Sequence, residues 1–149
     1  MDDYNTLNHF LVRVFNEILR IEEDCLKTGE FKNISVREMH VIEAVCEANG
    51  SDGSNRASDI AQALHISAGT LTTEVAVLEK KGCLVRKQDT SDRRIVRIYA
   101  TDKGLRANEL HQEFHRSMVS DVIEALTKEE TESLIKGLKS LVKFFNKDK

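Results

Sequence analysis

Apolar residues in the first 26 positions of the chain recur every three or four residues, which is the spacing of one face of an α-helix. Further apolar residues, including Val12, Phe15 and Leu19, stand beside this stripe. The stripe itself consists of Leu7, Phe10, Leu11, Val14, Ile18, Ile21 and Cys25. The pattern predicts a helix from Tyr4 to about Leu26 that packs against more than one partner.

Two short helices follow further along the chain. A capping box at Ser35–Glu38 first begins a longer helix, and turn-forming residues at 49–55 end it. A short helix at 58–64, a turn at 65–66 and a new helix capped by Ser67 come next. Two short helices joined by such a turn are typical of a helix-turn-helix.

The helix after Ser67 has one core face and one face of small residues. Leu71, Val75 and Leu78 share the core face. The opposite face carries Gly69, Thr70, Thr73, Ala76, Val77 and Lys80, with Thr72 at its flank. A surface of this kind can enter the DNA major groove, where hydroxyls reach base edges or phosphates. An ordinary amphipathic helix with a weakly polar exterior is the alternative interpretation.

A short hairpin is predicted after Gly82, because residues 84–87 and 96–100 have the composition and alternation of two strands. Residues 80–106 contain nine basic and three acidic side chains, a local net charge of +6 in a chain of net charge −3. Such segregation predicts a polyanionic partner. An arginine at the loop tip is suited to the narrow minor groove. Asp92 either braces Arg94 or is a free surface residue.

Two further helices are predicted at the C-terminal end. Thr101 caps one of about 24 residues, and a capping box at Thr127–Glu130 begins the other. The last helix has an apolar stripe of Leu134, Leu138, Leu141, Val142 and Phe145. Since a small winged module cannot cover these helices as well as the first one, a second copy of the chain is expected to do so. In such a dimer the two recognition helices lie about 34 Å apart.

Composition restricts the class of protein. With 149 residues, 40% of them hydrophobic, the chain fits one domain with one core. It has no run of roughly 18 apolar residues and no basic, then apolar N-terminus, so a cytoplasmic protein without a membrane partner is expected. We predict a mainly α fold with a small β wing: one domain over 1–149, with a winged helix-turn-helix at 35–101 between dimerisation helices at 1–34 and 102–149.

The order helix-turn-helix, LEKKGCLVR, DTSDRRIVRIYATDKG and a long helix resembles the MarR family of winged helix-turn-helix repressors. The resemblance implies a homodimer that binds a roughly palindromic double-stranded operator, without a catalytic site. From the pattern and the resemblance together, the candidate DNA-binding residues are Ser67, Gly69, Thr70, Thr72, Thr73, Lys80, Asp92, Arg93 and Arg94.

FNEILRIEE, FKNISVREMHVIE and HQEFHRSMV resemble the FabT branch of this family, repressors of fatty-acid-synthesis genes. That resemblance implies a corepressor, a long acyl chain presented on acyl carrier protein, and no other cofactor. The surplus apolar residues of the first helix, with two of the second, are candidates for an acyl pocket or else for dimer core. They are Phe10, Val14, Phe15, Ile18, Leu19, Met39 and Ile42.

Three other functions are alternatives to this one. A zinc-responsive regulator would use His111 and His115, one helical turn apart, with Glu38, His40 and Cys25 as further ligands, although Met39 stands where zinc-responsive relatives have a histidine. A thiol sensor is disfavoured because the start of the first helix has no cysteine, and we expect all three cysteines to be reduced. An enzyme is disfavoured because the sequence lacks phosphate-binding, dinucleotide-binding and H-E-x-x-H motifs.

Overall fold

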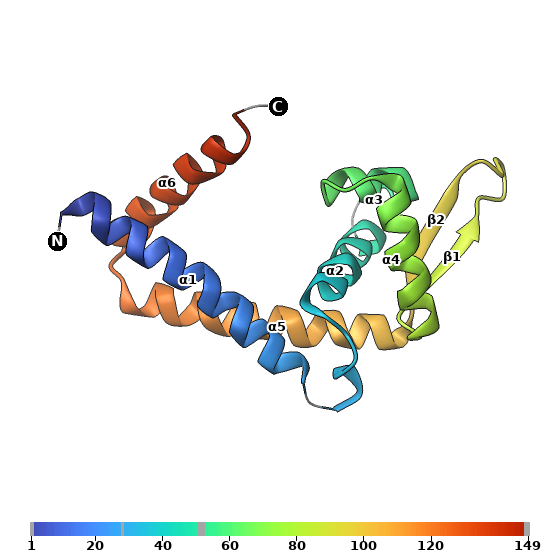
Figure 1. Cartoon of the computed structure of the whole chain (residues 1–149), viewed down its shortest axis with the longest axis horizontal. Coiled ribbons are helices and arrows are strands. Elements are labelled where there is room, and N and C mark those ends of the chain that lie inside the picture. The colour runs from blue at the N-terminus through green and yellow to red at the C-terminus, as the bar shows by residue number, and fades with distance from the viewer. Residues whose placement is uncertain (1, 28, 51–52, 148–149) are drawn as a thin grey trace. The chain divides into compact units, whose positions relative to one another are not determined.

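The computed structural model describes residues 2–27, 29–50 and 53–147. In these residues the chain forms six α-helices and one two-stranded sheet (Figure 1). Helix α1 spans Asp3–Leu26 and begins where the Asp2 carboxylate accepts a hydrogen bond from the backbone N–H of Asn5. A short 3₁₀ turn, Gly29–Phe31, follows it. The predicted first helix is confirmed to within one residue.

The winged helix-turn-helix is built from α2 (Val36–Gly50), α3 (Ala57–Ala63), α4 (Ala68–Lys80), β1 (Leu84–Gln88) and β2 (Val96–Ala100). The predicted capping box is present: the Ser35 backbone N–H donates to Glu38 Oε1 at 2.8 Å, and the Glu38 N–H donates to Ser35 Oγ at 3.1 Å. Residues 51–52 of the predicted loop at 49–55 lie outside the described part of the chain. The strands are antiparallel, with Leu84 opposite Ala100 and Gln88 opposite Val96.

One hydrophobic core joins these elements. Its largest fully buried side chains come from all three helices and both strands: Met39, Ile42, Ile60, Leu71, Leu78, Leu84 and Ile98. Full burial of one such side chain contributes about 1.5–3 kcal/mol. The core therefore fixes the orientation of α4 and of the wing relative to α2.

The T-D-K-G segment locks the base of the wing to the next helix. Gly82 ends α4 with a φ of 81°, in the left-handed region that favours glycine. Thr101 Oγ1 donates to the Gly82 carbonyl at 2.6 Å and accepts from the Gly104 N–H at 3.2 Å. Gly104 lies so close to the Cys83 carbonyl that a Cβ atom there would overlap it. Glycine at 104 is thus required by a close approach of two backbones.

Helices α5 (Asp102–Ala125) and α6 (Lys128–Phe145) complete the chain, and both bonds of the second predicted capping box are present, at Thr127 and Glu130. The chain divides into two compact units, Met1–Gln112 and Glu113–Lys149. Leu26 of α1 and Ala107 of α5 are buried in the same core as the winged helix-turn-helix. Among the described helices, none has the length and apolar character needed to span a membrane.

Candidate nucleic-acid interface

Helix α4 presents the predicted small outer face. Ser67 Oγ caps the helix by accepting from the Thr70 N–H at 3.1 Å. Leu71, Val75 and Leu78 are buried with at most 1% of their surface exposed. Outward positions are exposed at Gly69, Thr72, Thr73 and Lys80 and half-buried at Thr70. The structure therefore brings together every residue predicted for the recognition helix.

The threonine hydroxyls of this face are held in defined orientations. Thr72 Oγ1 donates to the Ala68 carbonyl at 2.9 Å, and Thr73 Oγ1 donates to the Gly69 carbonyl at 3.1 Å. Because each hydroxyl donates its proton to a carbonyl of the helix, its oxygen can act only as an acceptor toward a partner outside the helix. A base amino group can donate to such an oxygen, and a thymine methyl can pack against the threonine methyl.

Ion pairs from the neighbouring elements hold α4 in place. Lys81, directly after the helix, donates to both carboxylate oxygens of Glu38 at 2.8 Å. Burial raises the pKa of Glu38, but the hydrogen bonds from Lys81 and Ser35 outweigh burial and lower it overall. Glu79 near the end of α4 pairs with Arg86 of β1 at 2.8 Å. These contacts fix α4 against α2 and β1 on the side away from its outer face.

The tip of the wing carries the two predicted arginines. Arg94 is highly exposed, and its side chain lies against Asp92, with Nε 3.1 Å from Oδ1 and Nη2 3.0 Å from Oδ2. This hydrogen bonding lowers the pKa of Asp92. The prediction that Asp92 braces Arg94 is confirmed. Arg93 is exposed next to it.

The positive charge of residues 80–106 is used in two different ways. Lys81, Arg86, Arg97 and Arg106 each form an ion pair with an acidic residue, at 2.7–2.9 Å. These four hold the fold together, so the count of nine basic residues overstates the charge offered to a polyanion. The exposed cations near α4 and the wing tip are Lys80, Lys87, Arg93 and Arg94. Lys80 lies on α4, Lys87 on β1, and Arg93 and Arg94 in the turn between the two strands.

A helix that can enter the major groove, fixed beside a wing tipped with arginines, defines a winged helix-turn-helix DNA-binding protein. Residues 51–96 match the MarR family. The structure is similar to that of Streptococcus pneumoniae FabT in complex with DNA, with 36% identity over 99% of this chain and 100% of that one, at a TM-score of 0.88. The chain belongs to the MarR family, and it is a DNA-binding transcriptional regulator of that family rather than an enzyme.

Other comparisons agree with this assignment. An uncharacterised HTH-type transcriptional regulator, YwaE of Bacillus subtilis, is 38% identical over 80 residues, which are 53% of this chain and 46% of YwaE. The chain thus spans less than half the length of that relative. The MepR–DNA complex of S. aureus shares the fold, at a TM-score of 0.69 and 22% identity over 90% of this chain and 95% of that one.

The residues predicted to line an acyl pocket fall into two groups, one exposed or half-buried on α1 and one buried on α2. Phe10, Val14 and Phe15 are more than half exposed on α1, and Ile18 and Leu19 are half-buried. Met39 and Ile42 instead have 0% exposure inside the core of the winged module. Those two residues are therefore core residues rather than a pocket lining, because α2 turns them toward α3, α4 and the wing.

Of the residues of the zinc alternative, His40 and His111 lie beside the same carboxylate, that of Glu22, whereas Glu38 is bound elsewhere. Glu38 is held by Lys81 and by the capping box, so its carboxylate is not available as a free ligand. His40 lies with Nε2 3.5 Å from Glu22 Oε2. His115 stands one turn after His111 on α5, and Cys25 is half-buried.

His111 lies among carboxylates that its helical spacing to His115 does not predict. Its Nε2 lies 3.2 Å from Glu22 Oε1, and its Nδ1 lies 3.1 Å from Glu43 Oε2. Hydrogen bonding to Glu43 raises the pKa of His111, with a further contribution from Glu22, while burial opposes the rise. The available signal was Glu22 itself, an acidic residue four positions after Ile18 on an otherwise apolar stripe.

The surroundings of Cys46 bear on the thiol-sensor alternative. Burial, with Glu43 and Glu47 nearby, raises the pKa of the Cys46 thiol to about 11, which leaves it protonated and unreactive.

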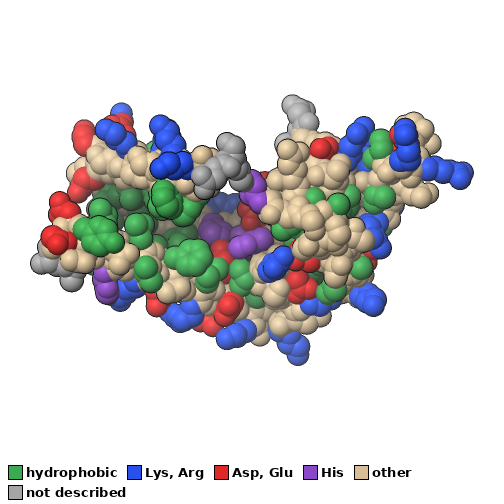
Figure 2. All heavy atoms as spheres, turned by 45° about the horizontal axis from the view of Figure 1, so that its top comes forward, with side chains coloured by type: hydrophobic (Ala, Val, Ile, Leu, Met, Phe, Trp, Pro, Cys, Tyr) green, Lys and Arg blue, Asp and Glu red, His purple; other side chains and the backbone are tan. Residues whose placement is uncertain are grey.

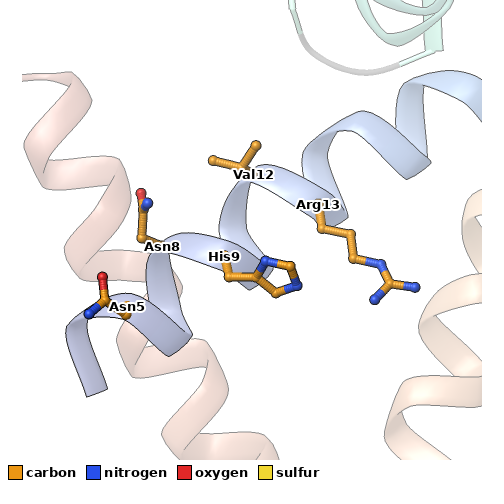
Figure 3. Close-up of a pocket in the computed structure, with 5 residues that line it drawn as sticks. All are labelled: Asn5, Asn8, His9, Val12 and Arg13. Atoms are coloured by element: carbon orange, nitrogen blue, oxygen red, sulfur yellow. The ribbon is translucent and has the colours of Figure 1, made fainter. Parts of the chain in front are cut away.

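Along α1, an open depression of about 700 Å³ is lined by Asn5, Asn8, His9, Val12 and Arg13 (Figure 3). Four of these five residues have polar side chains.

Proposed function

We propose that the protein is a dimeric repressor of fatty-acid-synthesis genes whose operator binding is strengthened by long acyl chains on acyl carrier protein. Each half of a roughly palindromic operator takes α4 of one protomer in its major groove and the wing tip in the adjacent minor groove. The similarity to the FabT–DNA complex over the whole chain is the observation that carries this proposal.

The dimer is supported by large apolar side chains that are exposed on α1 and α6 in the described part of the chain. On α1 the exposed large side chains include Leu7, Phe10 and Leu11, and on α6 they include Leu138 and Phe145. Figure 2 shows hydrophobic side chains gathered at the surface. Exposed apolar area on this scale is typical of an interface. A second copy that covers it also sets the distance between the two recognition helices.

The acyl chain is proposed to lie against the exposed apolar face of α1. Phe10, Val14 and Phe15 supply a surface that is more than half exposed, and Ile18 and Leu19 extend it toward the winged module. Each methylene group buried there contributes about 0.8 kcal/mol, so long chains bind better than short ones. A chain between the dimer helices and the winged modules favours one spacing of the recognition helices. The expected coupling is about 1–3 kcal/mol, or about 5- to 150-fold in operator affinity.

The test is a titration of labelled promoter DNA from fatty-acid-synthesis genes at fixed salt, with and without acyl carrier protein carrying long, short or no acyl chains. We expect tightening by the long-chain form, and little effect of the short-chain form or the unloaded carrier. The same titration with zinc and then a chelator examines the alternative through His111 and His115. No effect of any acyl chain, together with a chelator-reversible effect of zinc, would overturn the proposal in favour of a metal-responsive regulator.

A further inference from the structure

A hydrogen-bonded network at the base of the wing turn stands apart from the arginines at its tip. Arg97 of β2 donates from Nε to Asp89 Oδ1 at 2.7 Å and from Nη1 to Asn55 Oδ1 at 2.7 Å. The other oxygen of Asp89 accepts from the Ser91 hydroxyl at 2.6 Å and from the N–H groups of Ser91 and Asp92 at 3.1 Å. Both oxygens of Asp89 are therefore occupied.

The same network fastens the wing to the helix-turn-helix. The Ile98 N–H donates to the Asn55 carbonyl at 3.0 Å, and Arg56 pairs with Arg97 as an isolated β-bridge. The Asn49 side chain, from the last turn of α2, donates to the Ile98 carbonyl at 3.1 Å and accepts from the Ala100 N–H at 3.1 Å. The segment before α3 thus acts as a short third strand beside β2.

Asp89 and Arg97 are also well shielded for charged residues of a wing. The Asp89 side chain is 13% exposed and that of Arg97 is 29% exposed, whereas that of Arg94 is 89% exposed. The hydrogen bonds from Ser91 and the ion pair with Arg97 hold the pKa of Asp89 well below its usual range. Arg97 would have to leave Asp89 and Asn55 to reach a phosphate.

We infer that Asp89 and Arg97 are positioning residues for DNA recognition: they hold the turn that aims Arg93 and Arg94 and do not themselves contact DNA. The turn is closed by backbone bonds from the Asp89 N–H to the Ile95 carbonyl and from the Ile95 N–H to the Asp92 carbonyl. The ion pair at its base fixes how the closed turn leaves the sheet. This inference rests on DNA binding through the wing.

The inference makes a prediction of opposite sign to simple electrostatics. Asp89 is an acid beside a proposed DNA site, so removing its charge would by Coulomb's law strengthen binding to a polyanion. If Asp89 positions the tip, Asp89→Asn instead weakens operator binding, by roughly ten- to a hundredfold, the range that hydrogen bonds to charged groups support. Asp59→Asn is the matched control, because Asp59 is an exposed acid of α3 with no ion pair among the described residues. It should leave affinity unchanged or slightly higher.

A double-mutant cycle separates positioning from general loss of structure. If Asp89→Asn already displaces the turn, Arg94→Ala should reduce operator affinity much less in the Asp89→Asn background than in the wild type. Arg97→Lys should also weaken binding, since an ammonium cannot reproduce the two-sided contact with Asp89 and Asn55, whereas a plain phosphate contact would tolerate lysine. Thermal unfolding of each variant confirms that folded protein is compared, and Arg97→Lys replaces Asp89→Asn if the latter does not fold.

The outcomes distinguish this inference from the proposed function. If the wild type binds promoter DNA and Asp89→Asn binds as tightly as Asp59→Asn, the positioning role is wrong and DNA recognition stands. Additive costs of Asp89→Asn and Arg94→Ala, or full affinity of Arg97→Lys, would also overturn it. If the wild type binds no promoter DNA with or without acyl carrier protein, both fail together.

Discussion

Replacing Gly104 with alanine tests whether the wing and α5 are joined by a close backbone approach. A Cβ atom at this position would overlap the carbonyl oxygen of Cys83 and lie in tight contact with the carbonyl carbon, and these backbone atoms cannot move aside as a flexible side chain could. Overpacking of this kind costs about 1–3 kcal/mol. The higher helix propensity of alanine offsets up to ~1 kcal/mol of that cost. We therefore expect Gly104→Ala to lower the free energy of unfolding by about 1–2 kcal/mol.

Urea and thermal unfolding at fixed protein concentration measure this effect, and the expected fall in Tm is roughly 2–8 °C. Gly69→Ala is the matched control, because Gly69, like Gly104, lies in a helix. Unlike Gly104 it is exposed, and the nearest atom to a Cβ there, outside the helix backbone, is Ser67 Oγ at 4.0 Å. Its Tm should be unchanged or slightly higher. A Gly104→Ala protein as stable as Gly69→Ala would show that the base of the wing yields easily, and the argument for a rigid joint would be wrong.

Three further predictions concern the DNA interface and the buried histidine. Arg94→Ala should weaken operator binding by about 5- to 150-fold and lower the slope of binding against salt concentration by about one unit per half-site. The Tm should stay constant because the Arg94 side chain is exposed. Unchanged affinity at physiological salt would show that the wing tip is not part of the interface. Thr73→Glu should abolish binding by setting a carboxylate against phosphates, with the dimer intact by sedimentation, and wild-type binding would exclude α4 from the groove. The pKa of His111 is raised in the folded protein. Its contribution to the free energy of unfolding is therefore full below the ordinary pKa of about 6.5 and is lost as pH rises through the raised pKa. His111→Asn should flatten this decline in urea unfolding, and an unaltered pH profile would contradict the ion pairs with Glu22 and Glu43.

Local features of the fold could be predicted from the sequence because their causes are local. The capping boxes at Ser35 and Thr127 place their partners three residues apart, and both form as expected. The faces of α4 follow from helical spacing alone, which correctly predicts Leu71 in the core and Thr73 at the surface. Asp92 and Arg94 are two residues apart, and their pairing was likewise predictable.

Features that depend on distant parts of the chain could not be predicted in this way. Helical periodicity places Met39 on an apolar face of its helix, but it does not show whether that face packs against α1 or in the core of the winged module. Glu22 and His111 are 89 positions apart, and no spacing rule connects them. Counting charges between residues 80 and 106 could not show that Lys81 is neutralised by Glu38, 43 positions away. In each case the decisive partner comes from another element.

The central claim, that α4 and the wing tip of two protomers read adjacent turns of one operator, is tested most directly by hydroxyl-radical footprinting of the wild type and Arg94→Ala. For the wild type we expect two protected segments centred about 10–10.5 base pairs, or roughly 34 Å, apart, with further protection of the outer minor grooves. Arg94→Ala, at a concentration that restores occupancy, should lose the outer minor-groove protection and retain the central segments. A single protected segment, or identical footprints for the two proteins, would contradict the account.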